Sequence, residues 1–266
     1  MKPSSDFGAA AQDLTITTPD GHTILGLVGA PPSDMRGCML IQHGLNSSAK
    51  DVVAVGLLAE ASGFRALAID AQWSPNTPTN PASKLSTPEA LAKQMSGTIS
   101  DLQTAMDWFG AQPGCNPNHI GYIGISFGGI TGASMMRLDS RITAPVFVVA
   151  GADFRTIFSS SSVTEFQDWS KTDLDGAVAA FAQLEAGDGV REALTDTPIL
   201  MLNGTRDDVI TPDAAKNLHA AAGAHGTVQW FDGGHGIGDL VQLLTLTSSL
   251  GTWAGQHGAL LAPSAR

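Results

Sequence analysis

Three short stretches of the chain carry residues whose types and spacing suit nucleophilic chemistry. Gly124-Ile125-Ser126-Phe127-Gly128 places a serine between glycines at the end of an apolar run. Downstream, Asp207 follows one apolar run and His235 follows the next. A serine hydroxyl is a weak nucleophile at neutral pH, so it needs a base within hydrogen-bond reach and an acid that orients that base. The three stretches therefore predict a catalytic serine, acid and histidine.

The serine stretch has the composition of a sharp turn between a strand and a helix. Residues 119–125 are β-branched and apolar, as in a buried strand, and residues 130–138 are apolar and helix-compatible. A turn this tight would hold Ser126 at positive φ, where side chains two positions before and after it would collide with the turn. Glycines at 124 and 128 remove those collisions. The pattern indicates a nucleophile elbow, with the first N–H groups of a helix beneath the hydroxyl. A glycine-lined turn with an idle serine is the alternative for the motif alone.

Other acids and histidines compete for the two supporting roles. Asp208 could orient the histidine or pair with Arg206, and Asp153 also follows an apolar run. His235 could be a loop histidine bonded to backbone, but its place after the last predicted strand favours a general base. We expect His43, close to the site, to shape a loop rather than accept a proton. The predicted elements place four other histidines away from the site: His22, His119, His219 and His225.

Alternating strands and helices surround these residues. We predict strands at residues 14–17, 22–28, 38–42, 64–69, 119–125, 144–150, 199–203 and 227–231. Helices are expected at residues 52–61, from a cap at Ser86 through 109, and at 130–138, 212–222 and 237–253. Only the first two strands flank a tight hairpin turn, so the others should pair in parallel. The result is one α/β domain spanning residues 1–266, with about eight mostly parallel strands and helices on both faces.

Two segments interrupt the alternation. Residues 71–85 hold several prolines and should form a long loop, and residues 154–196 should form an insertion, or cap. We expect aromatic side chains from both segments to line an acyl pocket. Alternatively, the aromatic residues of the insertion bury a small core of their own. The candidate substrate-binding residues are Trp73, Phe158, Phe166 and Trp169.

Composition and charge exclude several classes of partner. The formal net charge of the 266 residues is -11, and no basic run could neutralise successive phosphates, so no nucleic-acid partner is expected. No stretch approaches 18 uninterrupted apolar residues, so we expect no membrane span. Without a recognisable signal peptide a cytoplasmic location is the default, and a secreted or periplasmic one would follow if a signal peptide was removed. A monomer or a homodimer is compatible with the sequence.

No metal or other cofactor is expected. The histidines and cysteines lack the spacing of metal ligands, and there is no phosphate-binding loop. Cys38 begins one predicted strand and Cys115 shortly precedes another. They could form a disulfide if those strands are neighbours, or stay as two buried thiols.

On these motifs the chain resembles serine hydrolases of the α/β-hydrolase fold, nearest to dienelactone-hydrolase-like esterases and acyl peptidases. The resemblance covers Asp13 to Gly258. It depends on the serine motif, on Gly204-Thr205-Arg206-Asp207 with Pro212, on Gly234-His235, and on His43-Gly44. It implies Ser126 as nucleophile, Asp207 as orienting acid and His235 as general base. It also implies an oxyanion hole formed by the N–H groups of Leu45 and Phe127.

The activity that this resemblance implies is hydrolysis of carboxylic esters through an acyl-enzyme intermediate. Serine at the elbow, where many dienelactone hydrolases have cysteine, favours ordinary ester chemistry. The modest insertion favours a small-molecule substrate, an ester with a small to medium acyl or aryl group. The alternatives are a serine peptidase or amidase of the prolyl-oligopeptidase type, and a catalytically silent hydrolase fold that binds a ligand.

Overall fold

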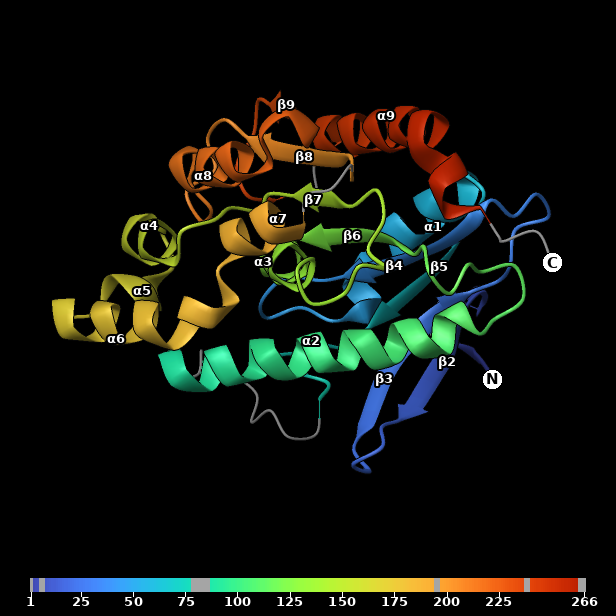
Figure 1. The fold of residues 1–266 in the computed structure, drawn as a ribbon, viewed down its shortest axis with the longest axis horizontal. Helices are drawn as coiled ribbons and strands as arrows, with labels where there is room; N and C mark the ends of the chain where they lie inside the picture. The colour runs from blue at the N-terminus through green and yellow to red at the C-terminus, as the bar shows by residue number, and fades with distance from the viewer. Residues whose placement is uncertain (1, 5–7, 78–86, 194–196, 237–239, 263–266) are drawn as a thin grey trace.

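The computed structural model describes residues 2–4, 8–77, 87–193, 197–236 and 240–262. These residues form one nine-stranded sheet with the order β1-β2-β3-β5-β4-β6-β7-β8-β9 (Figure 1). The antiparallel part comprises β1 (Lys2–Ser4), β2 (Gly8–Thr17) and β3 (Thr23–Gly29), and β3 also pairs antiparallel with β5. The parallel part comprises β5 (Phe64–Ile69), β4 (Gly37–Gln42), β6 (Gly121–Ile125), β7 (Val146–Val148), β8 (Ile199–Gly204) and β9 (Gly226–Phe231). The predicted fold class is confirmed, and the short β1 is the one strand beyond the eight predicted.

Helices cover both faces of the sheet (Figure 1). The face covered by α1 (Val53–Ala61) and α9 (Leu240–His257) has one hydrophobic core. The face covered by α2 (Pro88–Gly110), α3 (Phe127–Met135), α7 (Ala186–Ala193) and α8 (Pro212–Ala222) has another. Short 3-10 helices complete the elements: η1 (Ala49–Val52), η2 (Ala182–Leu184), η3 (Gly223–His225) and η4 (Gly258–Leu261).

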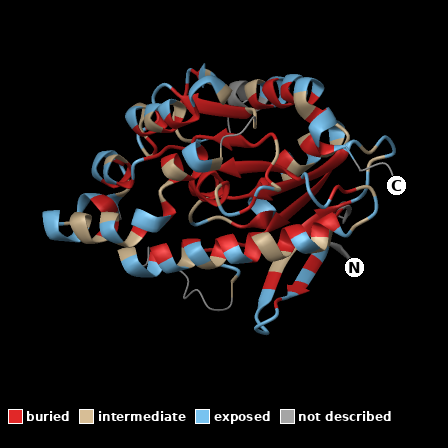
Figure 2. Cartoon of the chain, in the orientation of Figure 1, coloured by how far each residue is buried: buried red, intermediate tan, exposed pale blue. Residues whose placement is uncertain are grey.

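The central strands are apolar on both sides because both faces are covered. Every residue of β4, β5, β6 and β8 is buried, whereas the hairpin of β2 and β3 extends exposed residues toward solvent (Figure 2). Continuous apolar runs are typical of parallel strands sandwiched between helices. The sheet thus presents a rigid edge at the carboxyl ends of its parallel strands, from which loops can carry side chains.

Some boundaries differ from the sequence prediction. Strand β7 is shorter than residues 144–150, because Ala144 and Val149 adopt positive φ values of 50° and 45° and turn the chain out of regular strand geometry. The cap of α2 is Thr87, whose hydroxyl accepts the N–H of Ala90. Ser86, together with residues 78–85 of the predicted loop, lies outside the described residues.

The insertion at 154–196 folds as helices against the sheet domain, with residues 194–196 outside the described part. It contributes α4 (Phe154–Ser160), α5 (Thr164–Gln167), α6 (Lys171–Phe181) and α7. In Figure 1, α4, α5 and α6 lie beyond the ends toward which the parallel strands run. The ring of Phe181 packs on the rings of Phe154 and Phe127, the first residue of α3. The aromatic residues of the insertion therefore extend the core of the sheet domain instead of forming a separate one.

Cys38 and Cys115 form a disulfide. Strands β4 and β6 are adjacent, which brings the two Cα atoms to 5.3 Å. Both cysteines are buried. In the described part of the chain, no helix combines the length and the apolar character needed to traverse a bilayer.

Candidate active site

Ser126 lies in a one-residue turn between β6 and α3. Its φ is 54° and its ψ is -124°, a backbone conformation that residues other than glycine rarely adopt. A Cβ atom at Gly124 would lie 2.6 Å from the Gly128 carbonyl oxygen, inside the turn itself. A Cβ atom at Gly128 would lie 2.4 Å from the carbonyl oxygen of Gln42, at the end of β4. The first glycine therefore permits the turn, and the second lets α3 approach the neighbouring strand.

His235 and Asp207 come from the loops after β9 and β8. The Ser126 hydroxyl lies 2.8 Å from His235 Nε2, and His235 Nδ1 lies 2.9 Å and 3.1 Å from the two carboxylate oxygens of Asp207. The side chain of Asp207 is 1% exposed and that of His235 is 23% exposed. With Nδ1 donating to the carboxylate, Nε2 is left to accept the serine proton. The structure thus brings together the three residues that the sequence analysis singled out.

The competing acids lie elsewhere. Asp208 is exposed, and the Arg206 guanidinium pairs instead with Asp232 at 3.2 Å. Asp153 caps α4 by accepting the N–H of Thr156. Among the described acidic residues, the carboxylate that contacts His235 is that of Asp207.

The two residues expected to form the oxyanion hole lie beside the serine. Phe127 is the first residue of α3, where an N–H group has no partner within the helix. Leu45 follows Gly44, which packs so closely on the serine that a Cβ atom there would lie 3.1 Å from Ser126 Cβ. Gly44, Leu45, Ser126 and Phe127 all line one cavity of about 430 Å³. Both candidate donors are therefore near the serine, as an oxyanion hole requires.

Part of the cavity wall is apolar and comes from the insertion and from the loop that carries Asp207. Phe158 and Phe166, two of the candidate substrate-binding residues, line it. Trp73 and Trp169 are not among the lining residues: Trp169 packs behind Phe158 and Phe166, and Trp73 lies behind Phe127. Further apolar lining residues, which the sequence analysis did not single out, are Ile157, Val163, Val209 and Ile210. Val209 and Ile210 lie in the same loop as Asp207, two and three residues after it, so their position in the sequence could have indicated a place at the site.

Another part of the cavity wall is polar and comes from the segment that follows β4, as far as η1. Asn46, Ser47 and Asp51 line the cavity there. Burial opposes ionisation of Asp51, but hydrogen bonds from Ser48 and Ser47 outweigh it and lower the pKa of this carboxyl below its usual value. The cavity therefore has an apolar side and a side that carries a negative charge.

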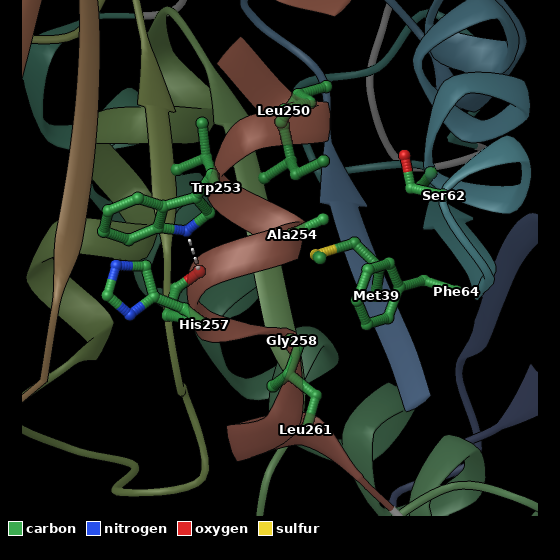
Figure 3. A pocket seen from close by; sticks show the side chains of 13 residues that line it. Met39, Ser62, Phe64, Leu250, Trp253, Ala254, His257, Gly258 and Leu261 are labelled. Atoms are coloured by element: carbon green, nitrogen blue, oxygen red, sulfur yellow. Dashed lines mark hydrogen bonds between the residues drawn. The ribbon is translucent and has the colours of Figure 1, made fainter. Parts of the chain in front are cut away.

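A second cavity lies under α9, on the face of the sheet that α1 and α9 cover (Figure 3). It has a volume of about 20 Å³ and is lined by apolar groups such as Met39, Phe64 and Leu250. Trp253 donates its indole N–H to the Ala144 carbonyl there, at 3.2 Å. A space of this size holds no substrate, so the cavity is a packing gap. The described residues include no group of three or more His, Cys, Asp or Glu side chains suited to a metal ion.

Comparisons with known proteins identify the family of the chain. A model of the prolyl oligopeptidase family matches residues 90–254, which is more than half of the chain and includes Ser126, Asp207 and His235. A comparison with curated proteins gave no significant match.

Solved structures share the fold at low sequence identity. An esterase from Pyrococcus furiosus is 17% identical with a TM-score of 0.67, over 93% of this chain and 90% of that chain. Acetyl xylan esterase 1 from Thermoanaerobacterium sp. JW/SL YS485 is 18% identical with a TM-score of 0.68, over 92% of this chain and 86% of that one. The acylaminoacyl peptidase of Pyrococcus horikoshii is 14% identical with a TM-score of 0.73, over 92% of this chain and 41% of the peptidase. The chain belongs to the prolyl oligopeptidase family and is a serine hydrolase with the α/β-hydrolase fold.

Proposed function

We propose that this serine hydrolase is a carboxylic ester hydrolase that uses Ser126, His235 and Asp207 and acts on esters with small to medium acyl or aryl groups. The observation that carries the proposal is the continuous series of hydrogen bonds from Asp207 through His235 to Ser126, at the wall of a cavity of about 430 Å³. A cavity of that size suits a small molecule.

The mechanism is acyl transfer to water. His235 Nε2 takes the proton of Ser126 Oγ as this oxygen attacks the ester carbonyl carbon, and the carbonyl oxygen becomes an oxyanion that accepts from the Leu45 and Phe127 N–H groups. The imidazolium then gives its proton to the alcohol oxygen as the ester bond breaks. Water attacks the acyl-enzyme in the same way, with His235 as base, and releases the carboxylic acid and the free serine. Asp207 orients the imidazole throughout.

The apolar and polar parts of the cavity wall support the preference for small to medium acyl or aryl groups. The apolar side, formed by Phe158, Phe166 and their neighbours, suits a hydrocarbon acyl or aryl group. The polar side, with Asn46 and Asp51, suits the part of the substrate that stays hydrated. The esterases among the similar structures add support for ester substrates.

A peptidase or amidase activity is the second candidate. The family match and the similarity to an acylaminoacyl peptidase favour it, because the same serine chemistry cleaves amides. Assaying nitrophenyl esters against nitroanilides with the same acyl group compares the two directly. The ratio of kcat/KM for the ester to kcat/KM for the anilide is compared with the ratio of their uncatalysed hydrolysis rates. An enzymatic ratio larger than the uncatalysed ratio supports ester hydrolysis. The reverse result would make the protein an amidase.

The test of the nucleophile uses a fluorophosphonate probe, mass mapping of the labelled residue, and the variant Ser126→Ala. We expect labelling at Ser126, turnover of nitrophenyl esters by the wild type, and a loss of about 10⁶ in kcat for the variant. Unchanged circular dichroism would show that the variant is folded. A variant that keeps most of its activity would contradict the assignment.

A further inference from the structure

Two ring N–H groups converge on one backbone carbonyl in the loop after β4. The indole Nε1–H of Trp73 donates to the Gly44 carbonyl oxygen at 2.9 Å, and the imidazole Nδ1–H of His43 donates to the same oxygen at 2.8 Å. This carbonyl belongs to the peptide group whose N–H is that of Leu45, one of the two expected oxyanion donors. Its orientation therefore matters for the chemistry at Ser126.

The protonation state of His43 is fixed by its other neighbour. The Ala71 N–H donates to His43 Nε2 at 3.0 Å, so Nε2 must be an acceptor and the ring proton sits on Nδ1. His43 is fully buried, and burial lowers its pKa, which keeps the ring neutral. The imidazole is thus a permanent donor to the Gly44 carbonyl.

Hydrogen bonds of the flanking backbone and a ring contact fix the position of Trp73. The Gln72 N–H donates to Thr98 Oγ1 on α2 at 3.0 Å, and the Ser74 N–H donates to the Ala71 carbonyl at 2.9 Å. Trp73 is 4% exposed, and its ring packs edge-on against the ring of Phe127, with centroids 4.9 Å apart and planes at 75°. It therefore touches the element that carries the second expected oxyanion donor as well.

The planarity of the peptide group connects these contacts to the active site. The described residues include no cis peptide bond, so the Leu45 N–H points opposite to the Gly44 carbonyl and away from the two rings. Leu45 lines the cavity with Ser126, whereas Trp73 does not. Resting on the proposed function, we propose that Trp73 is a positioning residue, whose indole N–H holds the Gly44–Leu45 peptide so that the Leu45 N–H donates to the oxyanion.

This role differs from the substrate contact expected from the sequence, and it predicts a specific kinetic pattern. Trp73→Phe keeps an aromatic ring against Phe127 and removes the indole donor. The Gly44 carbonyl then keeps the His43 Nδ1–H as a donor but loses one of its two ring donors. The Gly44–Leu45 peptide is held less firmly, so the Leu45 N–H is less well aligned with the developing oxyanion. Complete loss of a donor costs about 10²–10³ in kcat, so for misalignment we expect a loss of about tenfold in kcat, with KM within about twofold of the wild type. The affinity for an alkyl trifluoromethyl ketone, which forms an oxyanion on Ser126, should fall by a similar factor.

Trp253→Phe is the matched control. Trp253 is also buried, and its indole N–H also donates to a backbone carbonyl, that of Ala144, on the far face of the sheet (Figure 3). A merely structural role for Trp73 predicts that both variants lose thermal stability without any change in ketone affinity. Our proposal predicts that the ketone affinity changes only in Trp73→Phe.

The outcomes separate the two proposals. Absence of ester turnover and of Ser126 labelling in the wild type would overturn the proposed function. Normal wild-type turnover, with Trp73→Phe indistinguishable from Trp253→Phe in kcat and ketone affinity, would overturn the positioning role alone. If Trp73→Phe fails to fold, 3-benzothienylalanine at position 73 keeps the shape of the indole and lacks only its N–H. The same kinetic pattern is then expected.

Discussion

Among single residues, Asp207, the proposed catalytic acid, is distinguished by the hydrogen bonds that its carboxylate accepts. One carboxylate oxygen of Asp207 accepts the backbone N–H groups of Val209 and Ile210, both at 2.9 Å, in addition to its contact with His235. These bonds fix the carboxylate plane in a buried position. Asp208, next in the chain, is exposed and has no contact with the histidine ring among the described interactions.

Asp207→Asn should therefore be far more damaging than Asp208→Asn. An amide in place of the carboxylate can stabilise the wrong imidazole tautomer, and kcat should fall by about 10⁴ while KM changes little. Asp208→Asn has the same change of charge and should keep kcat within about twofold. Steady-state kinetics with a nitrophenyl ester measures both, and equal losses in the two variants would contradict the assignment of the acid.

Among the helices, those of the insertion provide part of the wall of the cavity beside Ser126, which we propose binds the substrate. Helix α4 carries Phe158 and α5 carries Phe166, and Val163 lies between the two helices at the cavity. Phe158 is fully buried and packs against Phe154 and Phe166 as well, so changing it would disturb the core. Val163 is only partly buried, which makes it the better position for changing the cavity alone.

Val163→Phe should shorten the acyl groups that the enzyme accepts, and Val163→Ala should lengthen them. A few methylene groups in an apolar pocket are worth about 1–3 kcal/mol, so the ratio of kcat/KM for octanoate to acetate esters should shift about tenfold in each direction. Val178→Phe on α6 is the matched control, because Val178 is also partly buried and does not line the cavity. The wall assignment is wrong if Val163→Phe and Val178→Phe give the same chain-length profile.

At the scale of the whole molecule, the disulfide joins segments that are distant in the chain. Cys38 and Cys115 are 77 residues apart and connect the start of β4 to the segment that precedes β6. Both side chains are buried, at 0% and 8% exposure, so a reductant reaches the bond only when the fold opens. The cross-link restricts the conformations of the unfolded chain. Its effect on the site is much smaller, because the site lies at the opposite ends of these strands.

Reduction of the disulfide should lower the free energy of unfolding by about 4 kcal/mol, because the unfolded chain regains the entropy that closing a loop of this span removes. Urea unfolding of oxidised and reduced wild type measures the difference without changing any side chain. Ester turnover well below the transition should be the same in both forms. The double variant Cys38→Ala and Cys115→Ala is the control, and its unfolding should not respond to the reductant.

Patterns in the sequence predict the fold class and the candidate triad of Ser126, Asp207 and His235. These are local signals, because the glycines around a strained serine and the place of an acid or a histidine after an apolar strand can be read within a few residues. The carboxyl ends of parallel strands meet at one edge, so order along the chain becomes proximity in space.

Three points depend on the tertiary structure: which acid contacts the imidazole, whether the cysteines are bonded, and where the Trp73 ring lies. Each depends on a contact between segments that are distant in sequence. The indole of Trp73 reaches a carbonyl 29 residues away, and no pattern of residue types records the direction of that hydrogen bond. An aromatic residue in a proline-rich loop suits a substrate pocket and a buried support equally well, and the packing of the loop against α2 and Phe127 decides between them.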